Sequence, residues 1–265
     1  MVNENMQKGN KQGQVAIFII IAILIVSGVL IYFLWVKPQY FPSSGGELNI
    51  DQCIADALED NVEMLGENGG FLEPDFSYMY NGKEVAYLCY TNLYYKGCTV
   101  QKPFLKQHFE DELERAVREE INLCYEDSIS ELKRKGFDVV SGLPDLDIVL
   151  EPGRAVVLLD VPVAVSSQGL SQSFTSFKTE VSSRMYDILM LSTAILQSET
   201  RYGEADVTSM MLFYPDFGID KIRRSDGTTI YIIEDLKSKA KFKFAIRSFA
   251  WPAGYGTDTG LVSGV

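Results

Sequence analysis

Basic residues and histidine are scarce in this chain of 265 residues. It has 24 Lys and Arg against 36 Asp and Glu, a formal net charge of -12, and a single His at position 108. The shortage of positive charge excludes a basic nucleic-acid-binding surface as the main function, because phosphate binding needs a positive field. Serine–histidine catalysis is disfavoured as well, because His108 would have to serve as its base.

Common catalytic and metal-binding motifs are also missing. The sequence has no Gly-x-Ser-x-Gly elbow, no Walker loop and no His-Glu-x-x-His. Asp145 and Asp147 could bind a divalent cation if other oxygens converged, but such acids are more often solvated. We therefore expect no catalytic residue, metal or cofactor, and keep a hydrolase based on these two acids as the least favoured alternative. We expect His108 to be an exposed surface residue.

Polar residues are almost absent from one stretch, residues 15–36, in which only Ser27 and Gly28 are not apolar. As a helix it would extend roughly 33 Å, enough to cross a hydrocarbon core about 30 Å thick. We predict a transmembrane helix over residues 15–36 that contacts membrane lipid.

The charges beside this stretch predict its orientation. Lys8 and Lys11 precede it, whereas Lys37 alone follows closely. Basic residues favour the cytoplasmic side, so the N-terminus is expected inside the cell. The predicted organisation is a cytoplasmic arm (1–14), the transmembrane helix (15–36), a Pro- and Gly-containing linker (37–48), an extracytoplasmic α+β domain (49–252) with a possible subdomain split near 136, and a flexible tail (253–265).

The segment Lys11-Gln12-Gly13-Gln14 directly precedes the apolar stretch. It resembles the archaeal class III signal of type IV pilin-like subunits, which is cut after the Gly. The resemblance implies possible processing after Gly13, with Gln14 as the first mature residue. Ala16 and Phe18 depart from the pattern, because pilins usually carry Ser and Glu there. A pilin-like structural subunit of a surface filament is accordingly the alternative function.

Four features are spread along the chain: residues 13–18 entering the apolar stretch, Cys53, Gly69-Gly70-Phe71 and Cys124. In these features the whole chain resembles a group of uncharacterised single-span archaeal envelope proteins. This resemblance implies the topology but no particular chemistry.

Hydrophobic periodicity beyond the linker predicts a mixed domain with antiparallel sheet and several amphipathic helices. The first helix would be capped by Asn49 or Asp51 and stopped by Gly66. The other predicted helices are Leu105–Cys124, a separate piece Ser128–Lys135, and one from Met185 to Leu196. Predicted strands lie within 71–101 (two or three, with a hairpin at Asn81-Gly82), at 139–140, 146–150, 155–165 and 171–181, at 219–223 and 228–233 around a hairpin at 225–227, and at 241–249.

All four cysteines follow the apolar stretch, at positions 53, 89, 98 and 124. An even number confined to a predicted exported region indicates two disulfides. We prefer Cys89 with Cys98, and Cys53 with Cys124. Zinc is disfavoured because no two cysteines have the close spacing of a Cys-x-x-Cys pair.

Tyrosine is concentrated between residues 71 and 101. The six are Tyr78, Tyr80, Tyr87, Tyr90, Tyr94 and Tyr95. They could form an aromatic platform that binds sugar or peptide. The alternative, which we favour, is a set of cross-strand pairs that stiffen a small sheet. Together these observations predict a membrane-anchored, non-enzymatic binding or interaction protein of the cell envelope, with protein partners there and none among nucleic acids.

Overall fold

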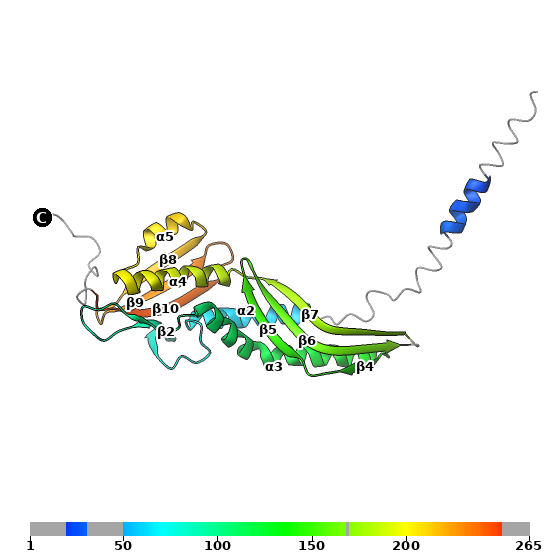
Figure 1. Ribbon diagram of the computed structural model, residues 1–265, viewed down its shortest axis with the longest axis horizontal. Helices are drawn as coiled ribbons and strands as arrows, with labels where there is room; N and C mark the ends of the chain where they lie inside the picture. The colour runs from blue at the N-terminus through cyan, green and yellow to red at the C-terminus, as the bar shows by residue number, and fades with distance from the viewer. Residues whose placement is uncertain (1–19, 31–49, 168–169, 251–265) are drawn as a thin grey trace, which may run out of the picture. The chain divides into compact units, whose positions relative to one another are not determined.

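The computed structural model describes residues 20–30, 50–167 and 170–250 (Figure 1). The chain divides into two compact units, Met1–Glu47 and Leu48–Val265. Residues 20–30 of the first unit are helical. Within the described ranges, no helix combines the length and the apolar character that crossing a bilayer requires. The predicted arm with Gly13 and Gln14, both ends of the apolar stretch, the linker and the tail lie outside the described residues.

The second unit has an α+β fold with two sheets, which confirms the predicted class. The larger sheet is mixed and has the strand order β1-β2-β10-β9-β8, with β3 beside β2. All its neighbours are antiparallel except β2 and β10, which are parallel. The strands are β1 (Ser77–Tyr80), β2 (Lys83–Tyr90), β3 (Thr99–Val100), β8 (Phe217–Arg223), β9 (Thr228–Asp235) and β10 (Lys241–Arg247).

The smaller sheet is antiparallel. It contains β4 (Asp138–Ser141), β5 (Asp145–Glu151), β6 (Arg154–Ser167) and β7 (Leu170–Ser182). The long strand β6 pairs with β4 and β5 along one edge and with β7 along the other. Because β4–β7 lie in sequence between β3 and β8, the two sheets are nested along the chain rather than successive.

Four helices accompany the sheets: α2 (Asp51–Glu67), α3 (Leu105–Arg134), α4 (Met185–Tyr202) and α5 (Val207–Phe213). The helix α3 is about 45 Å long at 1.5 Å per residue. It contacts α2 and α4 as well as β4 and β5 of the smaller sheet (Figure 1). Its Phe109 ring also lies 6.2 Å from that of Phe242 on β10, so the helix packs against both sheets.

The main hydrophobic core extends through both sheets. On β10, Phe242, Phe244 and Ile246 alternate with other residues and are almost completely buried. Side chains on one face of a strand recur every second residue, so these three define the face that α2 and α4 cover. Ala245, between two of them, and Arg247, after the last, point to the opposite face.

The predicted break after Cys124 was wrong, because α3 is one helix from Leu105 to Arg134. Tyr125, Ile129 and Leu132 are buried and continue the apolar face past the expected end. No Gly or Pro interrupts this range, and a polar group of residues at 126–128 does not by itself stop a helix.

The expected ends of the first helix also need correction. Asp51 is the first residue of α2 and accepts a hydrogen bond from Thr179 (2.7 Å) instead of capping the helix. Asn49 lies outside the described residues. The helix continues through Gly66, where a Cβ would overlap the main-chain oxygen of Lys241. Gly66 therefore allows α2 to approach β10 closely, and the chain turns afterwards at Gly69 and Gly70, which both have positive φ.

The strands are largely where the sequence predicts them, whereas α5 was missed. Asp206 precedes α5, and its carboxylate accepts a hydrogen bond from the Ser209 amide (3.1 Å), as an N-cap does. The helix has no buried residue, so it lacks the apolar periodicity that revealed the longer helices.

Candidate binding surface

Four of the six predicted tyrosines lie together on the face of the larger sheet that points away from α2 and α4. Tyr78, Tyr80 and Tyr90 pack against a small cluster of Val85, Tyr87 and Ala245, separate from the main core. Tyr87 lies opposite Ala245 in the ladder between β2 and β10.

The β1–β2 hairpin brings the first two tyrosines onto this face. Its turn residues Asn81 and Gly82 have φ values of 50° and 80°. A two-residue turn with two positive φ angles matches the twist of paired strands, which confirms the tight hairpin expected from Asn-Gly. The register pairs Tyr78 with Val85 and Tyr80 with Lys83, so both tyrosines share one side of the hairpin.

The rings are in mutual contact. Tyr87 lies 5.3 Å from Tyr90 and 6.3 Å from Tyr78 between ring centroids, both in edge-to-face geometry. Phe76 joins them, at 4.8 Å from Tyr87 and 4.6 Å from Tyr90. Phe76 is 45% exposed, whereas Tyr87 is only 8% exposed. Sequence reasoning missed Phe76 because it considered only tyrosines.

Two arginines complete the cluster, and sequence reasoning missed both. Arg247 donates from Nη1 to the Tyr90 hydroxyl (2.9 Å), and its guanidinium lies 5.6 Å from the Tyr90 ring and 4.9 Å from the Phe249 ring. Arg224 lies 5.5 Å from the Tyr80 ring. Within the described part of the chain, neither arginine forms an ion pair with a carboxylate. Each guanidinium instead lies against an aromatic ring face, and Arg247 also contacts a neutral hydroxyl.

The last two predicted tyrosines lie in the loop after β2. Tyr94 is 67% exposed and packs on Phe249 (4.9 Å between centroids), so Arg247 links it to the other rings. Tyr95 is 80% exposed, with φ at 58°. We use the name aromatic strip for this connected set: Phe76, Tyr78, Tyr80, Tyr87, Tyr90, Tyr94, Phe249, Arg224 and Arg247.

The loop that carries Tyr94 is attached at several points. Cys89 on β2 is bonded to Cys98, with Cα atoms 5.4 Å apart. The amides of Thr91 and Tyr95 donate to the carbonyls of Arg247 (2.9 Å) and Phe249 (2.7 Å). These bonds hold the loop against the end of β10 and fix Tyr94 beside Phe249.

The second disulfide lies elsewhere. Cys53 on α2 is bonded to Cys124 on α3, with Cα atoms 6.2 Å apart. Both Cα separations lie in the usual disulfide range. The two pairs are the ones that we preferred from the sequence.

Tyr87 anchors the strip to the sheet. Its hydroxyl is 2.9 Å from Oγ1 of the buried Thr228 on β9. Burial raises the pKa of Tyr87 above its ordinary value, and the Thr228 hydrogen bond only partly opposes this. The phenol is therefore neutral at physiological pH, and the strip offers ring faces and two cations rather than an acid and a base.

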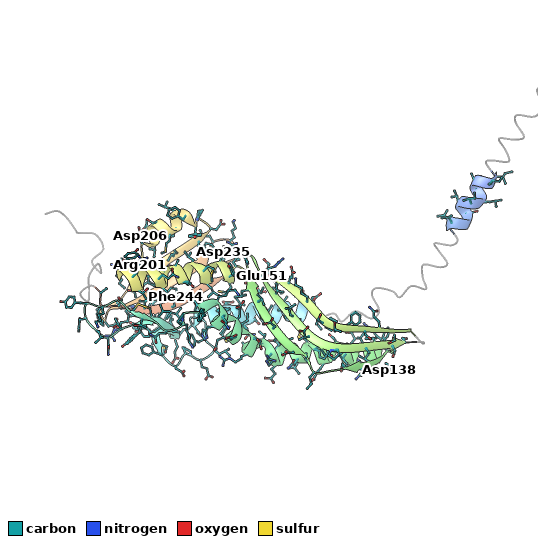
Figure 2. The ribbon with its side chains drawn as sticks, viewed as in Figure 1. Asp138, Glu151, Arg201, Asp206, Asp235 and Phe244 are labelled. Atoms are coloured by element: carbon teal, nitrogen blue, oxygen red, sulfur yellow. A yellow bond between two sulfur atoms is a disulfide. The ribbon has the colours of Figure 1, made fainter. Side chains whose placement is uncertain are left out.

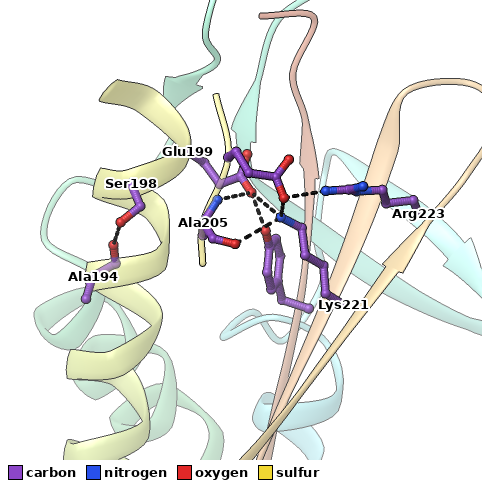
Figure 3. A network of polar contacts seen from close by, with 8 residues as sticks. Ala194, Ser198, Glu199, Ala205, Lys221 and Arg223 are labelled. Carbon is purple, nitrogen blue, oxygen red and sulfur yellow. Dashed lines mark hydrogen bonds and ion pairs between the residues drawn. The ribbon is translucent and has the colours of Figure 1, made fainter. Parts of the chain in front are cut away.

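A separate polar network joins the end of α4 to β8 and β9 (Figure 3). The Tyr231 hydroxyl donates to the Glu199 carboxylate, which also accepts from the Ala205 amide (3.2 Å) and lies 3.4 Å from Lys221 Nζ. Lys221 also pairs with Glu204 (2.5 Å), which contacts Arg223 as well. Because Tyr231 and Glu199 are almost completely buried, this network acts on stability rather than on ligands.

The two acids considered as a possible cation site, Asp145 and Asp147, lie on β5. Both carboxylates are on the exposed side of the strand, whereas Leu146 between them and Ile148 after them are buried. Among the described residues, no group of three His, Cys, Asp or Glu side chains could hold a metal ion.

The expectation of an exposed His108 was wrong. The residue is only partly exposed, its ring lies 4.4 Å from that of Phe71, and its Nε2 is buried without a hydrogen-bond partner in the described structure. Burial, with help from the charge of Lys102, lowers the pKa of His108 to about 4. The imidazole is therefore neutral and packs as an aromatic ring.

No protein-family model matches the chain, and the searches of curated proteins and of solved structures likewise give no match.

Proposed function

We propose that this chain is a membrane-anchored, non-enzymatic binding protein of the cell envelope, whose α+β domain lies outside the cytoplasm and binds its ligand through the aromatic strip. The apolar residues 15–36 support the anchor, and the basic residues before them support a cytoplasmic N-terminus. The two cysteine pairs support an oxidising location for the domain.

The aromatic strip is the observation that carries the binding role. Phe76 and Tyr94 expose large parts of their rings, although both are held in place by neighbours. Aromatic residues and arginine are enriched at binding interfaces, because they offer contact area at a small loss of conformational entropy. The packing of Tyr78, Tyr87 and Tyr90 also stabilises the sheet. Within the strip, stiffening of the sheet therefore falls to these inner tyrosines and ligand binding to the exposed rings.

Site-specific crosslinking in native membranes tests the binding role. In one variant a photoreactive phenylalanine derivative replaces Tyr94. In the control it replaces Leu143, which is 92% exposed and lies between β4 and β5. We expect crosslinked adducts from position 94 and none from position 143. Adducts at neither position, or equally at both, would contradict the proposal.

Protease added to intact cells tests the location. The domain should be digested while the N-terminal arm is spared, and the undigested protein should have no thiol that reacts with an alkylating reagent before reduction. Four reactive thiols in the native protein would place the domain in a reducing compartment instead.

The alternative is a pilin-like subunit of a surface filament. It is supported by the Gly13-Gln14 motif before the apolar stretch and weakened by Phe18 at the position where pilins carry Glu. It predicts sheared filaments whose subunits begin at Gln14. The membrane-anchored binding protein predicts single particles in detergent.

A further inference from the structure

We infer that the aromatic strip takes an anionic polysaccharide, with Arg224 and Arg247 binding its carboxylate or sulfate groups and the rings of Phe76 and Tyr94 stacking on its sugars. This inference rests on the proposed function, because it specifies the ligand of the same surface. The reasons lie in the charge of the two arginines, the exposure of the rings and the pairing of β2.

Arg224 and Arg247 belong to a minority of arginines in the described part of the domain that form no ion pair with a carboxylate; Arg134 and Arg201 are the others. Most of the domain's other arginines form ion pairs with carboxylates: Arg115, Arg118, Arg154, Arg184 and Arg223. Arg224 is exposed, and Arg247 uses Nη1 and Nε on the Tyr90 hydroxyl and the Asp226 carbonyl, both neutral acceptors. An anionic ligand would supply the charged partner that each guanidinium lacks, and such hydrogen bonds are about twice as strong as neutral ones.

The acidic character of the whole chain does not prevent this contact. At physiological ionic strength, charges more than about 8 Å apart are largely screened by salt. A bound carboxylate or sulfate would therefore respond to the guanidinium that it touches more than to distant acids.

The rings favour a sugar over a peptide. An extended peptide commonly binds by adding a strand to a free sheet edge. β2, however, is already paired with β1 and β3 and also with β10. The outer strand β1, which pairs only with β2 among the described strands, is four residues long and offers a short edge. The exposed rings of Phe76 and Tyr94 instead offer flat apolar faces whose negative quadrupole attracts the C–H groups of a sugar ring. The two arginines lie against different rings of the strip, which suits a polymer that carries repeated charges.

Equilibrium binding to the full-length protein in detergent micelles tests this inference. The probes are polygalacturonate, dextran sulfate, neutral dextran and poly-L-glutamate of matched length. We expect at least one of the two anionic polysaccharides to bind, and neutral dextran and polyglutamate to bind at least tenfold more weakly. Failure of both anionic polysaccharides to bind, or equal binding of polyglutamate, overturns the inference.

A pair of matched variants locates the site. Arg224→Gln removes one strip cation, whereas Arg201→Gln removes an arginine that lies at the same 5.5 Å from a ring, that of Tyr202, near the end of α4 (Figure 2). Losing a hydrogen bond to a charged group should weaken polysaccharide binding by about tenfold or more in Arg224→Gln. Arg201→Gln should remain within about twofold of the wild type. Equal losses in the two variants would show binding by general charge and contradict the assignment.

The two proposals can fail separately. If position 94 gives crosslinks in native membranes but neither anionic polysaccharide binds, the binding role stands and the ligand class is wrong. If position 94 gives no crosslink and no polysaccharide binds, both are wrong.

Discussion

Removing either disulfide should destabilise the domain, and the longer bridge should matter more. A disulfide restricts the unfolded chain according to the length of the loop that it closes. The Cys53–Cys124 bond joins residues separated by 71 positions, whereas Cys89 and Cys98 are separated by 9. The chain-entropy relation gives about 4.4 kcal/mol for the longer loop and about 2.7 kcal/mol for the shorter one, a difference of about 1.7 kcal/mol.

Two double variants isolate the bonds. Cys89→Ala/Cys98→Ala leaves only the long bridge, and Cys53→Ala/Cys124→Ala leaves only the short one. The free energy of unfolding of each full-length variant is measured by guanidinium titration in detergent micelles, with and without a dithiol reductant. Each variant is compared with itself, so the packing lost by alanine cancels. This matters because Cys89 and Cys98 are buried, whereas Cys53 is exposed.

The difference between the two reductant effects tests the loop argument. A larger effect in the variant that keeps Cys53 and Cys124 supports it. Equal effects, or a larger effect for the short bridge, would refute it and indicate that local contacts around each bond dominate. Wild-type protein treated with alkylating reagent before reduction controls for partial oxidation.

Three further predictions concern buried polar groups. His108 has a pKa lowered to about 4, so the folded state binds fewer protons and loses stability as pH falls from about 6.5 toward 4. The loss in the free energy of unfolding due to this partly exposed group should be about 1 kcal/mol. His108→Gln should therefore flatten the dependence of the melting temperature on pH between about 6.5 and 4. An unchanged dependence would contradict the lowered pKa of His108. Burial and the Glu199 carboxylate raise the pKa of Tyr231. Stability should therefore fall above about pH 10 in the wild type and fall less in Tyr231→Phe, measured by thermal melts at increasing pH. Parallel curves for the two proteins would argue against this role of Tyr231. Glu199→Gln should lower the free energy of unfolding by about 1–3 kcal/mol, because Lys221 and Tyr231 lose a charged acceptor. The control Glu151→Gln, at an exposed ion pair, should change it little. Equal changes in the two variants would contradict a stabilising role of the Glu199 network.

The sequence predicts the elements of this fold better than their connections. Long amphipathic segments and the Asn81-Gly82 turn have local signals, and the structure confirms them. The close approach of Gly66 to β10 depends on Lys241, which lies 175 positions further along the chain. The parallel pairing of β2 with β10 is equally non-local, so periodicity within either strand cannot reveal it.

In the candidate site, too, residues close in sequence could be predicted to lie together, whereas contacts between distant segments could not. Clustering of Tyr78, Tyr80, Tyr87 and Tyr90 could be anticipated, because they lie close together in the sequence. Arg224 and Arg247 could not, because the pairing of β8, β9 and β10 brings them to the tyrosines from far along the chain. The partial burial of His108 was missed for the same reason, since Phe71 reaches it from another element.

The two roles of the tyrosine-rich segment depend on one another. Tyr87 is fixed by Thr228 and covers Ala245, so the inner rings give the outer face of the sheet a packed layer. Because that layer is rigid, Phe76 and Arg247 need not be ordered when a ligand arrives, and less conformational entropy is lost on binding. A mutation that loosens the inner layer should therefore weaken binding without removing a contact. Tyr87→Phe, which removes only the hydroxyl bonded to Thr228, should reduce polysaccharide affinity mainly by increasing the dissociation rate, and a fall in the association rate alone would argue against this coupling.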